Sequence, residues 1–302
     1  MFARWRLLAV GAVALASLPS AVLAGDSPAG FYYGTDTNSP TVSGSPPYQE
    51  PSVGGTYGGY IGEWAGWGNY TGCFNMYNFN TTNASDADTN LNSYGSGVGA
   101  GDYYALAGPG LDPNYNGTTS EAATWGTGQA EYAVSVYNNL YSNGSSDAVY
   151  YKILFADVEG SDNSDIPYSS EGWNTVWAPG TCGQTFVSNG IPLAVDQAEI
   201  NAFVNYINND GGTAAWAGVY SSSQYWTYTF GSGFDISTWE WTYENQASLS
   251  PGPSGWCEGS TCGQFFGGVS SSSGYAAAWQ WSNAATNGNV GDWDQIDTNN
   301  QP

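Results

Sequence analysis

Residues 150–160 of the chain read YYKILFADVEG, an apolar and aromatic run that ends in two acids and a glycine. A run of this length, bounded by a turn residue, indicates a buried strand. Residues two apart on a strand project to the same face, so Asp157 and Glu159 are expected side by side at its carboxyl end. Two such neighbours are costly to ionise together, and one should keep its proton to a higher pH. The plain alternative is that the pair only ends a strand and caps the next turn.

The composition is acidic, aromatic and poor in bases. At 302 residues the chain is long enough for one barrel-sized domain. It has 26 acids and three bases, and two of the bases (Arg4 and Arg6) precede residue 25, which leaves Lys152 and a net charge near −25 beyond that point. This balance argues against a nucleic-acid partner. The sequence contains no His, which argues against His-dependent triads and His-ligated metals, so we expect no metal and no cofactor.

The scarcity of bases also favours a particular surrounding. In an acidic medium protonated carboxyls carry little net charge, and few Lys or Arg remain to repel one another. The composition therefore fits a protein secreted into acidic surroundings.

Residues 1–24 have the pattern of a signal peptide. Arg4 and Arg6 form a positive start, an apolar run follows over 7–16, and the segment ends in Val22-Leu23-Ala24. No other apolar run approaches the roughly 20 residues that span a bilayer. We therefore predict that residues 25–302 form one secreted, extracellular domain without a membrane span, which we expect to be a monomer.

Four cysteines remain in the exported part of the chain. An even number in such a chain indicates two disulfides, with three possible pairings. Cys257 and Cys262 flank a short loop and are expected to pair locally, which leaves Cys73 with Cys182. A zinc site is the poorer alternative, because the spacing matches no zinc pattern.

Strands and helices are expected to alternate along the chain. One helix, capped by Asp196 and ended by Gly211, has apolar residues at i, i+3, i+4 and i+7 spacing: Ile200, Phe203, Val204 and Ile207. Other helices are expected over 119–141, capped by Thr119 or Ser120, and near 224–229. Strands are expected over 30–36, 57–67, 102–107, 150–159, 215–222, 238–243, 276–281 and 293–297.

This alternation predicts an α/β fold, a single (β/α) TIM-type barrel with expanded loops over 69–100, 160–194 and 245–274 and two disulfides. In such barrels the active site lies at the carboxyl ends of the strands. Acids follow or end the expected strands at Asp36, Asp157, Glu159 and Asp297. We expect these four carboxyls to converge.

Several segments resemble the bacterial family 25 glycoside hydrolases, muramidases that cut peptidoglycan, and a related glycoside-hydrolase-like domain. FADVE at 155–159 is similar to their Asp-x-Glu strand, and GVYSS at 218–222 resembles a later strand. WQWS at 279–282, with Asp294 and IDTN at 296–299, looks like their closing segment, and GTD at 34–36 is compatible with their first strand. The matches run in the family's order from about residue 30 to 299.

The resemblance implies roles for these acids. Glu159 would be the general acid that protonates the leaving glycosidic oxygen. Asp157 would stay charged and stabilise the developing positive charge or a substrate N-acetyl group, and Asp36 and Asp297 would hold substrate or tune Glu159. Paired carboxyls are what glycosidase chemistry needs in any case, and their i, i+2 spacing favours retention of configuration.

Aromatic side chains are candidates for stacking on sugar rings. We expect Tyr33, Tyr220, Trp239 and Trp279 to contact substrate, although most aromatics in a chain with 14 Trp and 23 Tyr must belong to the core or the general surface.

Three functions remain open on the sequence. The first is a secreted glycosidase that cleaves cell-wall polysaccharide, with that glycan as its partner. The second is a catalytically silent glycan-binding or envelope protein on the same barrel, which the acidic charge favours. The third is an acid hydrolase such as a carboxyl peptidase, which the sequence disfavours because Asp36-Thr37 is followed by Asn38 and not by Gly.

Overall fold

The computed structural model of the protein describes twelve segments of the chain: 31–37, 56–70, 73–78, 99–143, 149–159, 171–177, 186–212, 216–234, 236–243, 269–270, 278–282 and 292–297. The expected signal peptide lies outside them, as do Cys182, Cys257, Cys262 and the side chain of Cys73. The two disulfides and the domain boundary at residue 25 therefore stay predictions.

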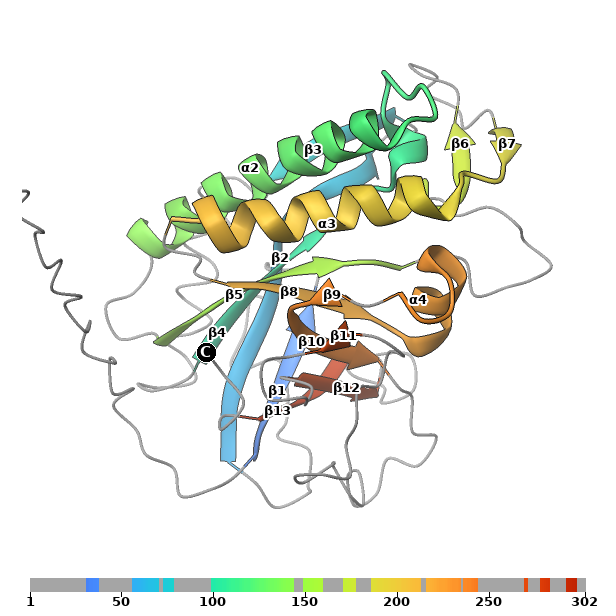
Figure 1. The fold of residues 1–302 in the computed structure, drawn as a ribbon. Helices are drawn as coiled ribbons and strands as arrows, with labels where there is room; N and C mark the ends of the chain where they lie inside the picture. Colours follow the sequence, from blue (N-terminus) through green and yellow to red (C-terminus); the bar gives the residue numbers. More distant parts are fainter. Residues whose placement is uncertain are drawn as a thin grey trace, which may run out of the picture.

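One nine-stranded sheet organises the described residues (Figure 1). Its strands are β1 (Phe31–Thr37), β2 (Thr56–Tyr70), β3 (Cys73–Asn78), β4 (Gly99–Ala105), β5 (Val149–Asp157), β8 (Trp216–Ser221), β10 (Trp239–Tyr243), β12 (Ala278–Ser282) and β13 (Asp292–Asp297). Their spatial order is β1-β13-β12-β10-β8-β5-β4-β2-β3, and β1 also pairs with β2. Pairing is parallel from β1 through β2, β4, β5, β8 and β10 to β12.

The last strand breaks the parallel pattern. β13 runs antiparallel to both of its neighbours, β12 and β1, and β3 is antiparallel to β2. The prediction of an α/β fold with a mainly parallel sheet is confirmed. The uniform parallel order of a TIM-type barrel is not what the described strands show.

Helices cover one face of this sheet. They are η1 (Pro109–Leu111), α2 (Thr119–Asn143), α3 (Leu193–Asp210) and α4 (Ser223–Phe230). Figure 1 shows α2 and α3 lying side by side across the sheet. Two small sheets complete the described elements, formed by β6 (Thr175–Trp177) with β7 (Phe186–Asn189) and by β9 (Ile236–Ser237) with β11 (Val269–Ser270). In the described part of the chain, no helix has both the length and the apolar character needed to cross a membrane.

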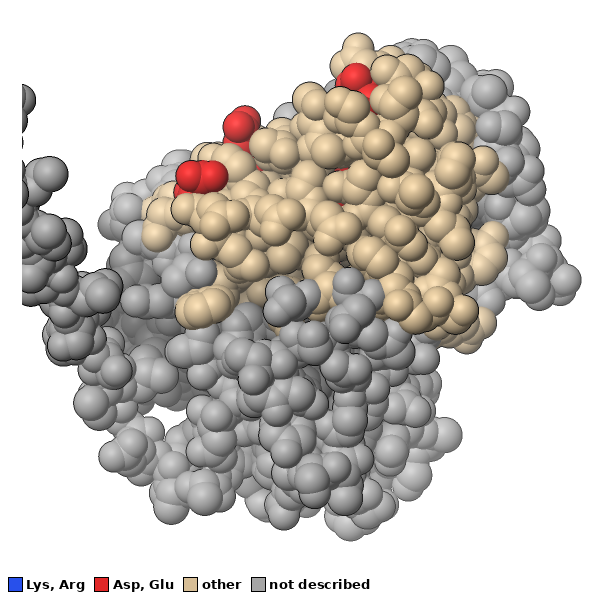
Figure 2. All heavy atoms as spheres, viewed as in Figure 1, with Lys and Arg blue, Asp and Glu red and all other residues tan. Residues whose placement is uncertain are grey.

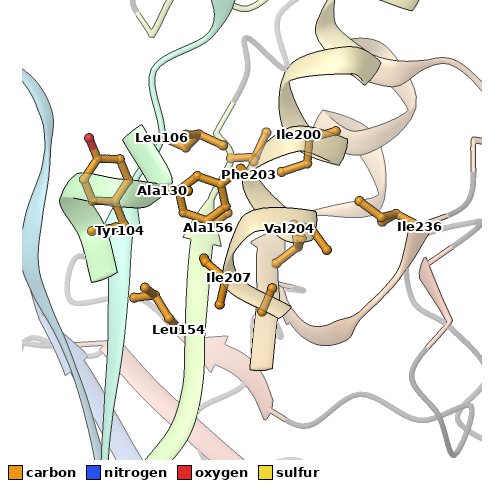
Figure 3. Packing of buried hydrophobic residues seen from close by; sticks show 14 of the residues in the cluster. Tyr104, Leu106, Ala130, Leu154, Ala156, Ile200, Phe203, Val204, Ile207 and Ile236 are labelled. Atoms are coloured by element: carbon orange, nitrogen blue, oxygen red, sulfur yellow. The ribbon is translucent and has the colours of Figure 1, made fainter. Parts of the chain in front are cut away.

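The main hydrophobic core lies between the sheet and these helices. All four residues of the predicted apolar stripe of α3 are buried there, namely Ile200, Phe203, Val204 and Ile207. They meet Leu106, Leu154 and Ala156 from the sheet side, as the close-up in Figure 3 shows. Burial of each large aliphatic or aromatic side chain contributes about 1.5–3 kcal/mol, so this stripe fixes α3 on the sheet.

Helices α2 and α3 approach each other closely at one glycine. A Cβ built on Gly126 of α2 would lie 2.9 Å from Cγ of Glu199 in α3 and closer still to the backbone oxygen of that residue. The absence of a side chain at Gly126 therefore allows the two helices to touch.

Several local expectations need correction. Asp196 is not the N-cap of α3: the helix begins at Leu193 after Pro192, and Asp196 is a buried residue of its first turn. At the start of α2, Thr118 fills the capping role, since its Oγ1 accepts a hydrogen bond from Glu121 N (3.2 Å). Segments expected as loops contain β3, β6, β7 and β11, because short strands with polar sequences carry little periodic signal.

Candidate active site

Strand β5 separates two different environments. Leu154, Ala156 and Val158 belong to the core under the helices. Phe155 and Asp157 alternate with them, so they project from the opposite face of the sheet. Asp157 is therefore placed away from the helix-covered core, at the carboxyl end of its strand as the sequence predicts.

The backbone around Asp157 is held on both sides. Asp157 is paired with Ala105 of β4 and with Tyr220 of β8. Its carbonyl oxygen accepts a hydrogen bond from Leu106 N (3.0 Å), and Val158 N donates to Tyr220 O (2.9 Å). A fixed backbone at this point fixes the direction in which the carboxyl group leaves the strand.

Asp157 and Glu159 differ in exposure. The Asp157 side chain is half-buried and its Oδ1 atom is inaccessible to solvent, whereas Glu159 is exposed. The segment between them is tied to β8, because Ser221 Oγ donates to Val158 O (2.8 Å). The two acids thus occupy adjacent but unequal environments.

An aromatic cluster lies on the same face of the sheet as Asp157. Trp241 of β10 contacts Tyr220, Phe155 and Tyr103, with ring-centroid distances of 4.3, 5.5 and 5.7 Å. Gly218 of β8 makes room for this packing, since a Cβ there would overlap the ring of Phe155. We call Tyr103, Phe155, Tyr220 and Trp241 the aromatic cluster.

The Tyr220 side chain is anchored within this cluster. Its hydroxyl donates a hydrogen bond to Oε1 of Gln280 in β12, and both residues are buried. A ring that packs on Trp241 on one side and is only 7% exposed offers little surface for a sugar. Tyr220 therefore lies beside Asp157 as expected, but it is built into the wall of the site and is not an open stacking platform.

Asp36 and Asp297 lie at opposite ends of β1. Asp36 is near the carboxyl end of β1, whereas Asp297 pairs with Phe31 at the beginning of that strand. Five residues of extended strand correspond to roughly 17 Å. Because β13 is antiparallel, its first residues lie level with Asp36: Asp292 pairs with Asp36 and Asp294 with Gly34. The structure thus does not bring Asp297 to the edge where Asp36 lies.

The remaining expected contact residues are placed by backbone alone. Tyr33 lies in β1 opposite Gln295, and Trp279 lies in β12 opposite the same residue. Trp239 begins β10, opposite Gly218. Their side chains are outside the described part of the structure, so their contact with substrate stays a prediction.

Two members of this site, Trp241 and Gln280, are not among the four residues expected to contact substrate. Trp241 alternates with Trp239 in the run TWEWTY, but alternation alone does not say which tryptophan faces inward. Gln280 follows Trp279 in the closing segment and is 3% exposed, although glutamine is usually a surface residue. Each is recognised as part of the site only because its side chain contacts Tyr220.

A second group of acids is buried near the opposite face, at the start of the helices. Asp112 follows η1, and Asp196 and Glu199 lie in α3; they are 3%, 0% and 0% exposed. Burial raises the pKa of all three, and the charge of Asp196 raises the pKa of Glu199 further. Two hydrogen-bond donors oppose this effect of burial. The backbone N–H of Asn174 lowers the pKa of Asp196, and a hydrogen bond from Gln129 lowers the pKa of Glu199.

Neither group of acids forms a metal site. Within the described segments, no three His, Cys, Asp or Glu side chains are grouped so that they could hold a metal ion. What the described residues near Asp157 offer is carboxylate, amide, hydroxyl and aromatic chemistry.

Comparison with known proteins gave matches only among solved structures. No protein-family model and no curated protein matches the chain. The chain is similar to a family 25 lysozyme from Aspergillus fumigatus (15% identity, 88% of this chain and 94% of that chain, TM-score 0.47). It is also similar to a family 25 glycosyl hydrolase of Streptococcus pneumoniae described as a virulence factor participating in host cell invasion (13% identity, 88% and 87% covered, TM-score 0.41).

Proposed function

We propose that the protein is a secreted glycoside hydrolase that cleaves a cell-wall polysaccharide, with peptidoglycan as the first substrate to test. The observation that carries this proposal is the placement of Asp157 and Glu159. A half-buried carboxyl at the end of β5 stands beside an aromatic wall, and an exposed carboxyl follows two residues later. Two carboxyls in unequal environments are the minimum equipment for glycoside hydrolysis.

The proposed reaction gives each acid the role that the motif resemblance implies. Glu159 donates its proton to the glycosidic oxygen while the bond between that oxygen and the anomeric carbon breaks, and the electron pair leaves with the oxygen. Asp157 remains an anion and stabilises the positive charge that develops on the sugar. Water then adds to the anomeric carbon and returns a proton to Glu159. Asp36 is proposed to bind substrate from the neighbouring part of the sheet, and Asp292 or Asp294 takes the place expected for Asp297.

The barrel and its location belong to the same proposal. Pairing of β1 with β2 joins the ends of the strand series, which supports a closed eight-stranded barrel that departs from the regular TIM type at its antiparallel last strand. Residues 1–24 are proposed to direct export and residues 25–302 to form the active domain.

The test compares release of reducing ends from purified peptidoglycan by three proteins, between about pH 3 and about pH 7. The parent should release sugar. Glu159→Gln should lower the rate by at least about 10²-fold, because it cannot donate a proton. Glu131→Gln, which changes an exposed acid in α2, is the matched control and should retain the parent rate.

Equal rates for the parent and Glu159→Gln would overturn the assignment of the acid. A folded parent that releases nothing from peptidoglycan or from other wall glycans would favour the catalytically silent glycan-binding protein. That second function is compatible with the excess of acids over bases in the sequence. On the face shown in Figure 2 the described residues display a few acids. Binding of the parent to insoluble wall glycan would then be measured directly.

A further inference from the structure

Asp112, Asp196 and Glu199, which we call the buried acid trio, have no role in the proposed reaction. They lie where η1, α2 and α3 meet, on the helix side of the sheet. An uncompensated buried charge is strongly unfavourable, so a buried carboxyl is either paired with a cation or neutral. The groups that surround the trio decide whether its carboxyls are paired with a cation or neutral.

Hydrogen bonds tie Glu199 to the sheet through Gln129 of α2. Gln129 Nε2 donates to Glu199 Oε1 (2.9 Å) and to the backbone oxygen of Ala107 (2.9 Å). Gln129 Oε1 accepts from Ala107 N (3.0 Å). Ala107 directly follows Leu106, whose N–H donates to the carbonyl of Asp157. Glu199 is therefore part of a continuous polar contact from α3 through α2 to the end of β4.

The other titratable groups around the trio bring no positive charge. Asp196 and Asp112 face Glu199, Tyr104 of β4 lies within its electrostatic reach, Tyr115 faces Asp196, and Glu121 of α2 faces Asp112. All of these are acids or phenols. The second carboxyl oxygen of Glu199, Oε2, is buried and has no hydrogen-bond partner.

The sequence cannot supply a cation from elsewhere. After residue 24 its single base is Lys152, and it has no His. Lys152 precedes Asp157 by five residues in β5, and β5 pairs irregularly with β4 around Lys152, which leaves the two backbones roughly 12–17 Å apart along the strand. The trio, by contrast, is connected through Gln129 to the chain just after the carboxyl end of β4, beside Asp157. Lys152 is thus at the wrong end of the sheet to neutralise the trio.

We propose that the buried acid trio is an acid-dependent clamp: it joins η1, α2 and α3 while its carboxyls are protonated, and it loosens this corner of the fold when the medium becomes neutral. The clamp would make acidic surroundings a condition for full stability. It does not rest on the proposed glycosidase function, because none of its three side chains takes part in the proposed reaction.

The direction of the effect follows from linkage. The pKa of Glu199 is higher in the folded protein than in the unfolded chain. The trio therefore stabilises the fold below the ordinary carboxyl pKa, and this contribution is lost as the pH rises toward the raised folded pKa. Glu199→Gln keeps the neutral, protonated shape at every pH and should remove that part of the pH dependence.

The experiment measures the urea unfolding equilibrium of the protein from about pH 3 to about pH 7, for the parent, Glu199→Gln and Glu131→Gln. At about pH 4 the parent and Glu199→Gln should be nearly equal. At about pH 7 Glu199→Gln should increase the folding equilibrium constant by at least about tenfold, the equivalent of one pKa unit. Glu131→Gln removes the same charge from an exposed position of α2 and controls for the relief of general repulsion.

A Glu199→Gln curve that runs parallel to the parent at every pH, or that lies below it at neutral pH, would overturn the proposal. If that variant does not fold, hydrogen exchange in the parent protein tests the clamp instead. Corrected for intrinsic rates, amides of α2 and α3 should lose protection between about pH 4 and about pH 7 while those of β5 and β8 keep theirs. Equal loss in the helices and the strands would contradict a local clamp.

Discussion

The hydroxyl of Tyr220 is the most specific polar contact next to Asp157, and its removal has a calculable effect. Tyr220→Phe keeps the ring against Trp241 and deletes the hydroxyl that donates to Gln280. We expect a loss of about 1–3 kcal/mol in the free energy of unfolding, because a buried hydrogen bond is removed. Tyr228→Phe changes a partly exposed hydroxyl in α4 and should leave stability unchanged in the same urea titration. Equal effects of the two substitutions would contradict the anchored role of Tyr220.

Single residues were predicted from the sequence where local pattern suffices. The position of Asp157 at the end of a buried strand and the buried stripe of α3 are confirmed. The buried acids of α3 were not expected, although they lie within that stripe. Asp196 stands four residues before Ile200, and Glu199 stands four residues before Phe203. An acid inside an apolar stripe is a sequence signal for a buried carboxyl. The groups that surround such a carboxyl come from the neighbouring α2, which the local sequence of α3 does not reveal.

The contact between α2 and α3 depends on one glycine, and the same helix offers its control. Gly126→Ala introduces a methyl group where backbone and Cγ atoms of Glu199 already lie, so we expect destabilisation of about 1–3 kcal/mol. Gly128→Ala has no neighbouring atom within 4 Å and should stabilise α2 by up to about 1 kcal/mol, since alanine is the better helix former. Both are measured by urea unfolding at one acidic pH. A stabilising Gly126→Ala would show that the helices can separate freely.

The direction of β13 is the element that the sequence could not reveal. Its residues show a strand pattern, but a pattern of side chains is the same for parallel and antiparallel pairing. Only the hydrogen-bond register shows that Asp292 and not Asp297 lies opposite Asp36. The expected convergence of four acids assumed parallel pairing throughout, and this one strand removes Asp297 from the group.

The excess of acids acts on the whole molecule. With one base against 26 acids beyond residue 24, the charge at neutral pH is near −25 and the folded state repels itself. Raising NaCl from about 0.01 M to about 0.5 M at pH 7 should therefore raise Tm, because the screening length falls from about 30 Å to about 4 Å and the carboxylates then repel one another less. The same series at about pH 3, where most carboxyls are protonated, should change Tm little. A salt effect of equal size at both pH values would contradict self-repulsion as the cause.

The position of Lys152 has a consequence for survival among digestive enzymes. A protease that cuts after Lys or Arg finds a single cleavable bond beyond residue 24, the one between Lys152 and Ile153. That bond lies inside β5, next to the irregularity in its pairing with β4 and at the point where its pairing with β8 begins. A protease needs an extended, accessible segment, so cleavage requires this part of β5 to detach from the sheet. Against such enzymes, resistance to digestion and the integrity of the sheet are the same property.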